Sequence, residues 1–128
     1  MAKKRRAPGW DESEYLLDLH RFTVGFDNGF WITIRVTRTP PSEAVPHGLQ
    51  YALTLHGRND DRILGYDNAH PVDAASGPGR KSRRPRTADH VHRRGKQPVP
   101  YKFASPLQLL EDFWRDVHRA IDEDVGQT

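Results

Sequence analysis

The clearest pattern in the chain is a strict alternation of apolar and other side chains in two segments, residues 30–38 and 49–55. Successive side chains of a β-strand point to opposite faces of the sheet, so alternation predicts a strand with one buried face. Both segments are therefore predicted to be strands. Their apolar positions are Phe30, Ile32, Ile34, Val36, Leu49, Tyr51, Leu53 and Leu55.

Turn signals connect these segments to weaker ones. Residues 15–24 fit either a helix or a strand by their own pattern, but Asn28-Gly29 tolerates the positive φ of a tight hairpin turn. The turn favours a strand within residues 15–24 that pairs with residues 30–38. Further short strands are predicted at residues 62–67, 88–92 and 99–103.

The last segment has the strongest helical pattern. Ser105 is a predicted N-cap, Pro106 the first helical residue, and Gln108 completes a capping box. An apolar stripe follows at helical spacing, formed by Leu110, Phe113, Trp114, Val117 and Ile121. Acidic residues, Asp116 among them, and Arg115 are expected on the remaining faces. We therefore predict an α+β fold, an antiparallel β-meander of about four to six strands packed against a C-terminal amphipathic helix.

Length and composition fit one domain. The chain has 128 residues, and we expect a flexible basic arm at residues 1–13 and a single α+β domain at residues 14–124. Residues 68–87 are rich in Pro, Gly, Ser and Arg without periodicity, which predicts a basic loop insertion. The chain has no Cys, which excludes disulfides and thiolate zinc sites and fits a cytoplasmic protein. No apolar run approaches the roughly 20 residues of a membrane span, so no membrane partner is expected.

The formal net charge of +3 conceals two basic patches on an acidic body. Four of the twenty Lys and Arg residues lie at positions 3–6, and eight lie at positions 80–96 beside a single acid, Asp89. The rest of the chain carries eight bases and sixteen acids. Localised positive charge of this kind indicates a polyanion such as nucleic acid, or an acidic partner.

Residues 66–102 hold the densest candidate chemistry. If residues 89–92 are extended, His90 and His92 point to the same face, because side chains two apart in a strand align. Histidine titrates near neutral pH and can give or take a proton during RNA cleavage. Asp67 and Asp89 would orient these histidines. Phosphate binding would fall to nearby cations, namely Arg93, Arg94, Lys96 and Lys102.

Two other interpretations use the same region. His90 and His92 with Asp67 or His70 would make a mixed nitrogen and oxygen metal site, although His-x-His alone is a weak signal and no Cys supports it. A basic run could instead bind phosphates or an acidic partner without any chemistry, or be a solvated loop. That run consists of Arg80, Lys81, Arg83, Arg84 and Arg86.

The remaining histidines and aromatic residues carry weaker signals. His47 and His56 flank the strand at residues 49–55 and are predicted to be turn or surface residues. Trp31 and Tyr51 could stack on bases, but aromatic residues in strands usually pack in the core or in cross-strand pairs. We therefore interpret both as packing residues.

Several motifs together resemble the TumE-type toxin family over roughly residues 18–120. The most specific are Gly65-Tyr66-Asp67-Asn68 and Asp89-His90-x-His92. They follow the motif His47-Gly48-Leu49-Gln50-Tyr51. They precede Pro100-Tyr101-Lys102-Phe103 and the helix at residues 109–117.

The resemblance implies the toxin of a type II toxin–antitoxin pair, encoded beside an antitoxin with a helix-turn-helix domain. It places Tyr66, Asp67, Asp89, His90 and His92 at the signature positions. Relatives pass from Asp-Asn to Asp-His within a few residues, whereas about twenty intervene here and add a nucleic-acid contact in our interpretation.

The function predicted from the sequence is a toxin that cleaves RNA as a metal-independent ribonuclease, with no cofactor. Two alternatives stay open: a non-enzymatic protein that binds nucleic acid or a macromolecular complex through its Arg-rich loop, and a module that only docks a partner. A homo-oligomer is compatible with each of them.

Overall fold

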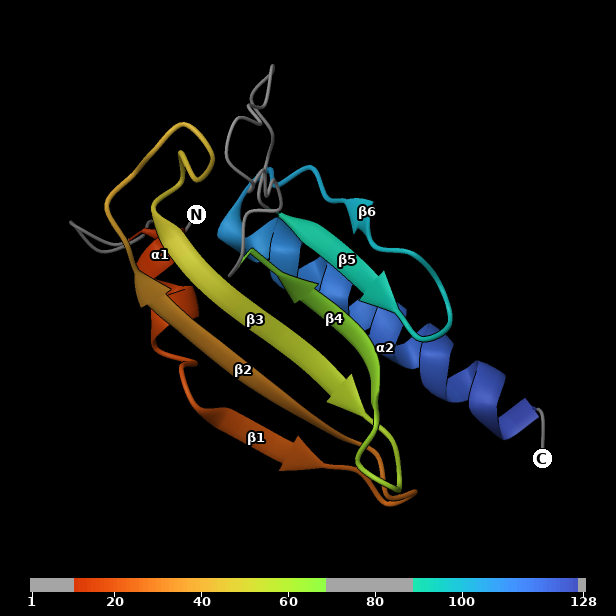
Figure 1. Cartoon of the computed structure of the whole chain (residues 1–128). Helices are drawn as coiled ribbons and strands as arrows, with labels where there is room; N and C mark the ends of the chain where they lie inside the picture. The colour runs from red at the N-terminus through yellow and green to blue at the C-terminus, as the bar shows by residue number, and fades with distance from the viewer. Residues whose placement is uncertain (1–10, 69–88, 127–128) are drawn as a thin grey trace, which may run out of the picture.

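The computed structural model describes residues 11–68 and 89–126. In this part of the chain, six antiparallel strands follow one another in the sheet in the order in which they occur in the sequence (Figure 1). The predicted α+β meander with a C-terminal helix is confirmed. The elements are α1 (Glu12–Leu17), β1 (Phe22–Gly25), β2 (Trp31–Arg38), β3 (Leu49–His56), β4 (Arg62–Asp67), β5 (His90–Arg93), β6 (Val99–Pro100) and α2 (Pro106–Gly126).

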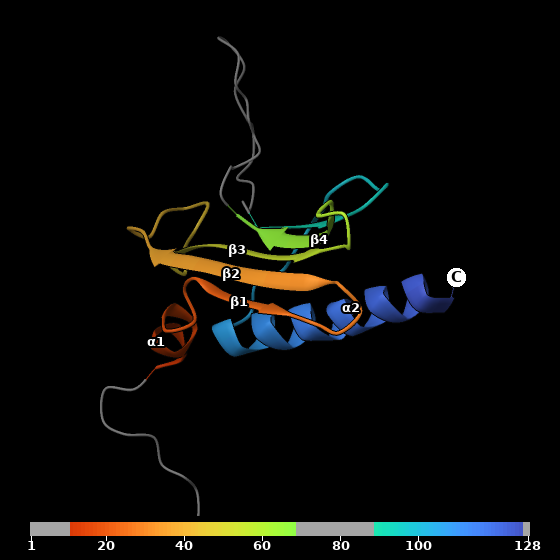
Figure 2. The same cartoon turned by 90° about the horizontal axis from the view of Figure 1, so that it is seen from below.

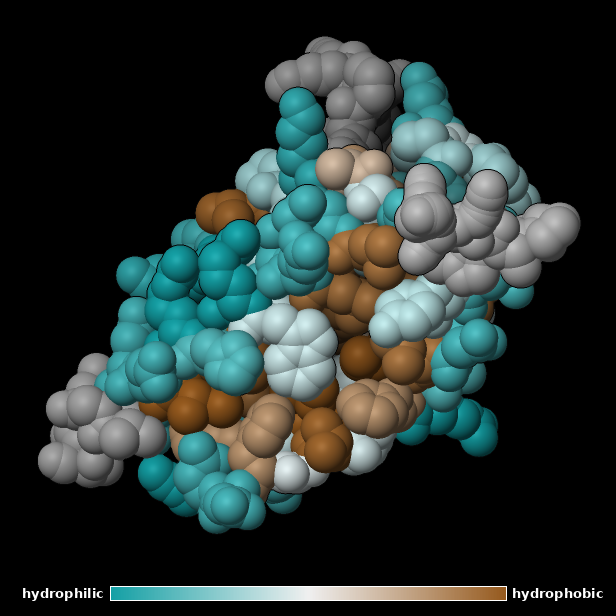
Figure 3. Space-filling view, turned by 180° about the vertical axis from the view of Figure 1, so that it is seen from behind, coloured by the Kyte–Doolittle hydropathy of each residue, from teal (hydrophilic) through white to brown (hydrophobic). Residues whose placement is uncertain are grey.

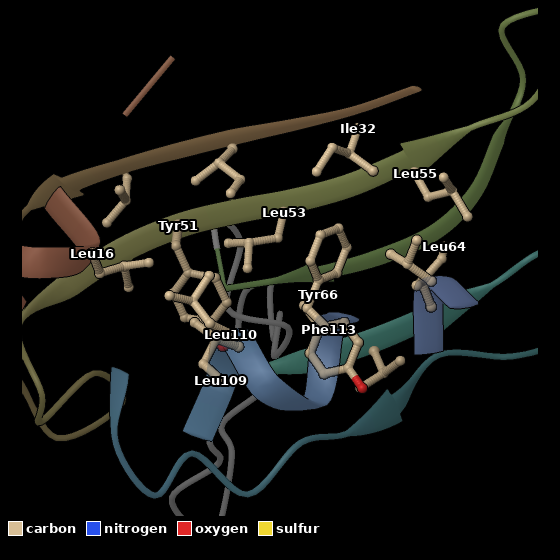
Figure 4. Close-up of a cluster of buried hydrophobic side chains, with 14 of the residues drawn as sticks. Leu16, Ile32, Tyr51, Leu53, Leu55, Leu64, Tyr66, Leu109, Leu110 and Phe113 are labelled. Carbon is tan, nitrogen blue, oxygen red and sulfur yellow. The ribbon is translucent and has the colours of Figure 1, made fainter. Parts of the chain in front are cut away.

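The molecule has two layers. Figure 2 shows that α1 and α2 lie on the same side of the sheet, and no described helix covers the opposite side. We call that opposite side the open face. On the helix side, the alternating apolar residues of β2 and β3 are all buried, as predicted. Side chains of the sheet such as Leu53 and Tyr66 meet Phe113 of α2 in this core (Figure 4).

The surface on the helix side is partly apolar. Figure 3 shows hydrophobic side chains gathered in the middle of this side, with hydrophilic residues around them. Several partly buried side chains pack there against the core, among them Leu17, Val24, Leu107, Trp114 and Ile121. The helices thus bury the apolar side of the sheet, and polar chemistry is left to the open face. No described helix is long and apolar enough to cross a membrane.

Helix α2 begins as its sequence predicts. The Ser105 Oγ accepts a hydrogen bond from the Gln108 backbone N–H at 3.1 Å, which satisfies one of the free donors at the helix start. The Gln108 side chain does not complete a capping box and instead donates to Asp112 at 2.9 Å. Asp116, expected on a polar face of the helix, is only 4% exposed. That expectation was wrong because Asp116 binds groups of the sheet.

The N-terminal part of the domain differs from the prediction. The Asp11 side chain caps α1, which starts at Glu12, so that the last two residues of the predicted arm are helical. Leu16 is fully buried and anchors this helix to the core. Residues 15–24 consequently contain the end of a helix, and strand β1 starts only at Phe22.

Two further boundaries differ. Strand β6 has only two residues, fewer than the predicted 99–103. Asn68, assigned to the loop insertion, is 3% exposed and belongs to the end of the sheet. Its amide group accepts from the Tyr51 N–H at 2.9 Å and donates to the Leu49 carbonyl at 2.8 Å. Residues 1–10 of the predicted arm and 69–87 of the predicted insertion lie outside the described residues.

Candidate functional site

Strands β4 and β5 lie side by side in the sheet (Figure 1), and their pairing gathers three of the predicted site residues on the open face. In this antiparallel register Asp67 lies opposite His90, and Gly65 lies opposite His92. Val91, between the two histidines, is buried on the helix side, so both imidazoles point to the open face. Their ring centroids are 6.3 Å apart. The prediction that His90 and His92 share a face is confirmed.

Asp67 is in contact with one of these histidines. Its Oδ2 lies 3.3 Å from the Nε2 of His92, and the side chains are 19% and 28% exposed, respectively. A carboxylate at one ring nitrogen sets the tautomer and the orientation of an imidazole. The Nδ1 of His92 is then the nitrogen that can exchange a proton with a substrate.

Arg62 also belongs to this site, although no motif in the sequence pointed to it. Its Nη1 lies 3.9 Å from the Asp67 Oδ2. The side chain crosses Gly65, where Arg62 atoms lie 3.4–3.6 Å from the position that a Cβ would take. A glycine inside a strand often marks a close approach of this kind, and that was the available signal.

A cavity of about 210 Å³ opens beside His92. Basic side chains line much of it. They come from the start of β4, from the end of β5 and from the tight turn after β5, where Gly95 has a φ of 79°. Arg94 is paired with Asp61 at 2.6 Å, and its side chain is still 53% exposed. The cavity is lined by Arg62, Ile63, His92, Arg93, Arg94, Gly95 and Lys96. Such a cavity suits an anionic group such as a phosphate.

The structure does not bring Tyr66 and Asp89 to the open face. Tyr66 is adjacent to Asp67 in β4 and so points to the helix side, where its hydroxyl donates to Asp116 at 2.5 Å. Asp89 is 2% exposed and accepts hydrogen bonds from the Tyr51 hydroxyl at 2.7 Å and from His47. Both residues therefore make buried hydrogen bonds that stabilise the interior on the helix side of the sheet.

The predicted phosphate ligands are divided in the same way. Arg93, Arg94 and Lys96 all line the cavity, but the Arg93 guanidinium is also paired with Asp116 on the helix side at 2.8 Å. Lys102 is exposed between β6 and α2. Arg80, Lys81, Arg83, Arg84 and Arg86 lie outside the described residues.

A family model described as Toxin TumE matches residues 12–121, from α1 to the second half of α2. The chain belongs to the TumE toxin family. No curated protein and no solved structure gave a match. As a TumE-family protein it is a toxin of a toxin–antitoxin system, which implies an antitoxin as its partner.

His47 lies in the turn before β3, as predicted, and its side chain has a structural role. In this TumE-family protein its side chain is 12% exposed, and its Nε2 lies 3.0 Å from the Asp89 Oδ2. The Leu49 N–H donates to its Nδ1 at 3.2 Å, so Nε2 carries the proton that Asp89 accepts. The ring also stacks on Phe103, with centroids 3.8 Å apart. With both nitrogens engaged, His47 positions Asp89 and has no proton to exchange with a substrate.

The arrangement of potential metal ligands in this TumE-family protein tests the metal-site interpretation. No three His, Cys, Asp or Glu side chains within residues 11–68 and 89–126 gather in a way that could hold a metal ion. His90, His92 and Asp67 therefore do not form such a site by themselves. His70, the other predicted ligand, lies outside the described residues.

Three tyrosines on the helix side are paired with carboxylates. Burial raises the pKa of Tyr51, and the charge and hydrogen-bonding of Asp89 raise it further. Burial followed by a hydrogen bond to a carboxylate likewise raises the pKa of Tyr66, through Asp116, and of Tyr101, through Asp112. All three hydroxyls are therefore held in the neutral form in the folded protein.

We expect alkaline unfolding as a consequence. A raised folded-state pKa contributes stability that is fully present below the unfolded tyrosine pKa of about 10 and is lost as the pH rises above it. Tyrosinate absorbance and circular dichroism, followed together in a pH titration, should show these tyrosines ionising only as the protein unfolds. Ionisation of Tyr51, Tyr66 and Tyr101 with the fold intact would contradict this. Tyr66→Phe should make stability fall less steeply above that pH.

Proposed function

We propose that this toxin cleaves RNA by acid–base catalysis, without a metal ion, at the His90 and His92 pair. The observation that carries the proposal is the contact between Asp67 and His92 beside a cationic cavity, with the second imidazole 6.3 Å away on the same face. Two proton-transfer groups on either side of a phosphate, with cations around them, meet the needs of phosphodiester cleavage.

His92 is the general base in this mechanism. Its Nδ1 takes the proton of the ribose 2′-hydroxyl, and the 2′-oxygen attacks the phosphorus. The P–O5′ bond breaks, and His90 donates the proton that the 5′-oxygen receives. Asp67 stabilises the imidazolium that forms on His92, because a carboxylate beside a protonated ring is a favourable charge pair. Arg62 and Lys96 face the negative charge that develops on the phosphate.

The test is cleavage of RNA by purified protein, together with growth after induced expression. We expect His92→Ala and His90→Ala each to lower the cleavage rate by roughly 10²- to 10⁴-fold, the usual contribution of a general acid or base. Asp67→Asn should lower it less, because it removes only the charge pair with the protonated His92 ring. Chelators should have no effect. His118→Ala is the matched control, since His118 is exposed on α2.

Growth arrest with RNA fragments for the wild type only would support the proposal. Growth arrest that persists in the His90→Ala/His92→Ala variant, with intact RNA, would contradict the proposed RNA cleavage. The second candidate is then a non-enzymatic nucleic-acid binder, favoured by the exposed cations of residues 93–96. In that case charge reversal of the basic run at residues 80–86 should abolish toxicity, and binding should weaken steeply with salt.

The nature of the partner is a proposal of its own. We infer that the antitoxin carries a helix-turn-helix domain and that the pair acts in the cytoplasm. The family resemblance supports the helix-turn-helix domain, and a chain without Cys fits the reducing cytoplasm. Copurification of the toxin with the product of the neighbouring gene tests the pairing directly.

A further inference from the structure

An aromatic pair stands on the open face beyond the histidine site. Trp31 in β2 lies opposite His56 in β3, and the two rings stack with centroids 4.1 Å apart and planes inclined by 13°. The indole N–H donates to the Asp60 carboxylate at 3.0 Å. The indole is thus held at a fixed orientation by two neighbours.

The side of Trp31 away from His56 borders an empty position. Its partner in β1 is Gly25, which has no side chain. Around the place that a Cβ on Gly25 would occupy, the nearest atom outside its chain neighbours is the Phe30 carbonyl oxygen at 4.0 Å. His56 covers the indole from the β3 side, so the other ring face is turned toward this gap. The gap is a slot in which a second flat ring can stack on Trp31.

The residues between the slot and the histidines on the open face are small or polar. Thr33 and Thr54 face each other in the register, and Gly65 and His92 continue that row. Arg35, exposed on the same face, lies in the neighbouring row that leads to Asp67 and His90. From His56 to His92 the path crosses two strand spacings and two residues, on the order of 12 Å.

These features select one class of ligand. A flat aromatic platform next to cations suits a base and its phosphates, because every base has a π-face and the backbone is anionic. Bases in a duplex already stack on both faces, whereas an unpaired base has a face to offer. A protein partner that docks through an apolar surface is a poor match for the open face, because the face carries polar and charged side chains.

We propose that the open face binds single-stranded RNA, with one unpaired base stacked on Trp31 over Gly25 and the strand running from there to His92. The proposal rests on the proposed function, since it names the substrate class of the same site. It adds Trp31 and Gly25 as binding residues, three and four strands away from β5, the strand that carries His92.

The experiment measures binding of a short, labelled, single-stranded 2′-O-methyl RNA and, separately, cleavage of the unmodified strand. The methylated probe cannot be cleaved by attack of its 2′-oxygen, so binding is measured without chemistry. We expect Trp31→Leu to weaken binding by about tenfold or more, as loss of a stacked base does, and Trp31→Tyr to retain most of it. A duplex of the same sequence should bind more weakly than the single strand.

Gly25→Val is the sharper variant. It leaves Trp31 in place and fills the slot, and a β-branched residue suits a strand at least as well as glycine does. It should therefore weaken RNA binding by about as much as Trp31→Leu while thermal stability stays the same or rises. Phe22→Leu is the matched control, because Phe22 is 42% exposed and pairs with Ile34, whose side chain is buried on the helix side.

The outcomes separate the two proposals. If Trp31→Leu and Gly25→Val bind the probe as tightly as the wild type, the stacking site is refuted, even if His92→Ala abolishes cleavage. If both variants lose binding while the wild type cleaves no RNA, the proposed RNA-binding face is supported and the proposed ribonuclease activity is refuted. Equal loss of binding in Phe22→Leu would show a general effect on the fold and would overturn the assignment of Trp31.

Discussion

Replacing Asp116 by alanine is expected to lower the free energy of unfolding by about 2 to 4 kcal/mol, because a buried hydroxyl and a half-exposed guanidinium both lose a charged acceptor. Asp116 is 4% exposed. Its Oδ2 accepts hydrogen bonds from the Tyr66 hydroxyl at 2.5 Å and from Arg93 at 2.8 Å. Without the carboxylate, the buried Tyr66 hydroxyl loses its acceptor and Arg93 loses its counter-charge.

Urea unfolding of the variant and the wild type measures this loss. Folded domains are stable by only about 5 to 15 kcal/mol, so Asp116→Ala should unfold at a clearly lower urea concentration than the wild type. Asp122→Ala is the matched control, since Asp122 is an exposed acid on the same helix, and its effect should stay within about 0.5 kcal/mol. A loss below about 1 kcal/mol for Asp116→Ala would show that the pairing with the sheet contributes little.

Asp89→Ala is expected to have the second large effect on stability, about 2 to 4 kcal/mol. The carboxylate is the acceptor of both Tyr51 and His47, and each buried donor left without an acceptor costs about 1 to 3 kcal/mol. Tyr51→Phe removes one of these bonds with its donor, so it should cost only about 1 kcal/mol. Unfolding of the single and double variants gives the coupling between the two positions.

The coupling decides which role Asp89 has. If it supports the interior, the double variant should show an interaction energy of about 0.5 to 3 kcal/mol, as neighbours in one network do. Cleavage per folded molecule should then change far less in Asp89→Asn than in His92→Ala. Additive effects on stability together with a large loss of cleavage would instead indicate that Asp89 orients the histidines, as the sequence suggested.

Strands β2 and β3 and helix α2 could be predicted because each carries its own periodicity. Ile32, Leu53 and Phe113 are buried where alternation or helical spacing puts them. The shared face of His90 and His92 was predictable for the same reason, since it depends only on the pleat of one strand. Local pattern was enough wherever the relevant partners lie within one element.

The rest depends on contacts between distant segments. His47 contacts Asp89, which is 42 positions away in the sequence. The local sequence around either residue gives no indication of this contact. Arg62 reaches Asp67 only because the strand register shifts between Leu55 and His56 and places Arg62 beside Gly65. The short helix α1 has six residues, too few for a clear apolar period, and it is anchored through tertiary contacts of Leu16.

The lengths of the strands have a consequence for a toxin that accumulates without its antitoxin. The two long strands, β2 and β3 with eight residues each, lie inside the sheet. The edges are β1 with four residues and β6 with two, one of which is Pro100. Short edges and an edge proline offer few free backbone groups to a strand of another molecule. The order of the strands therefore protects the protein from edge-to-edge aggregation at high concentration.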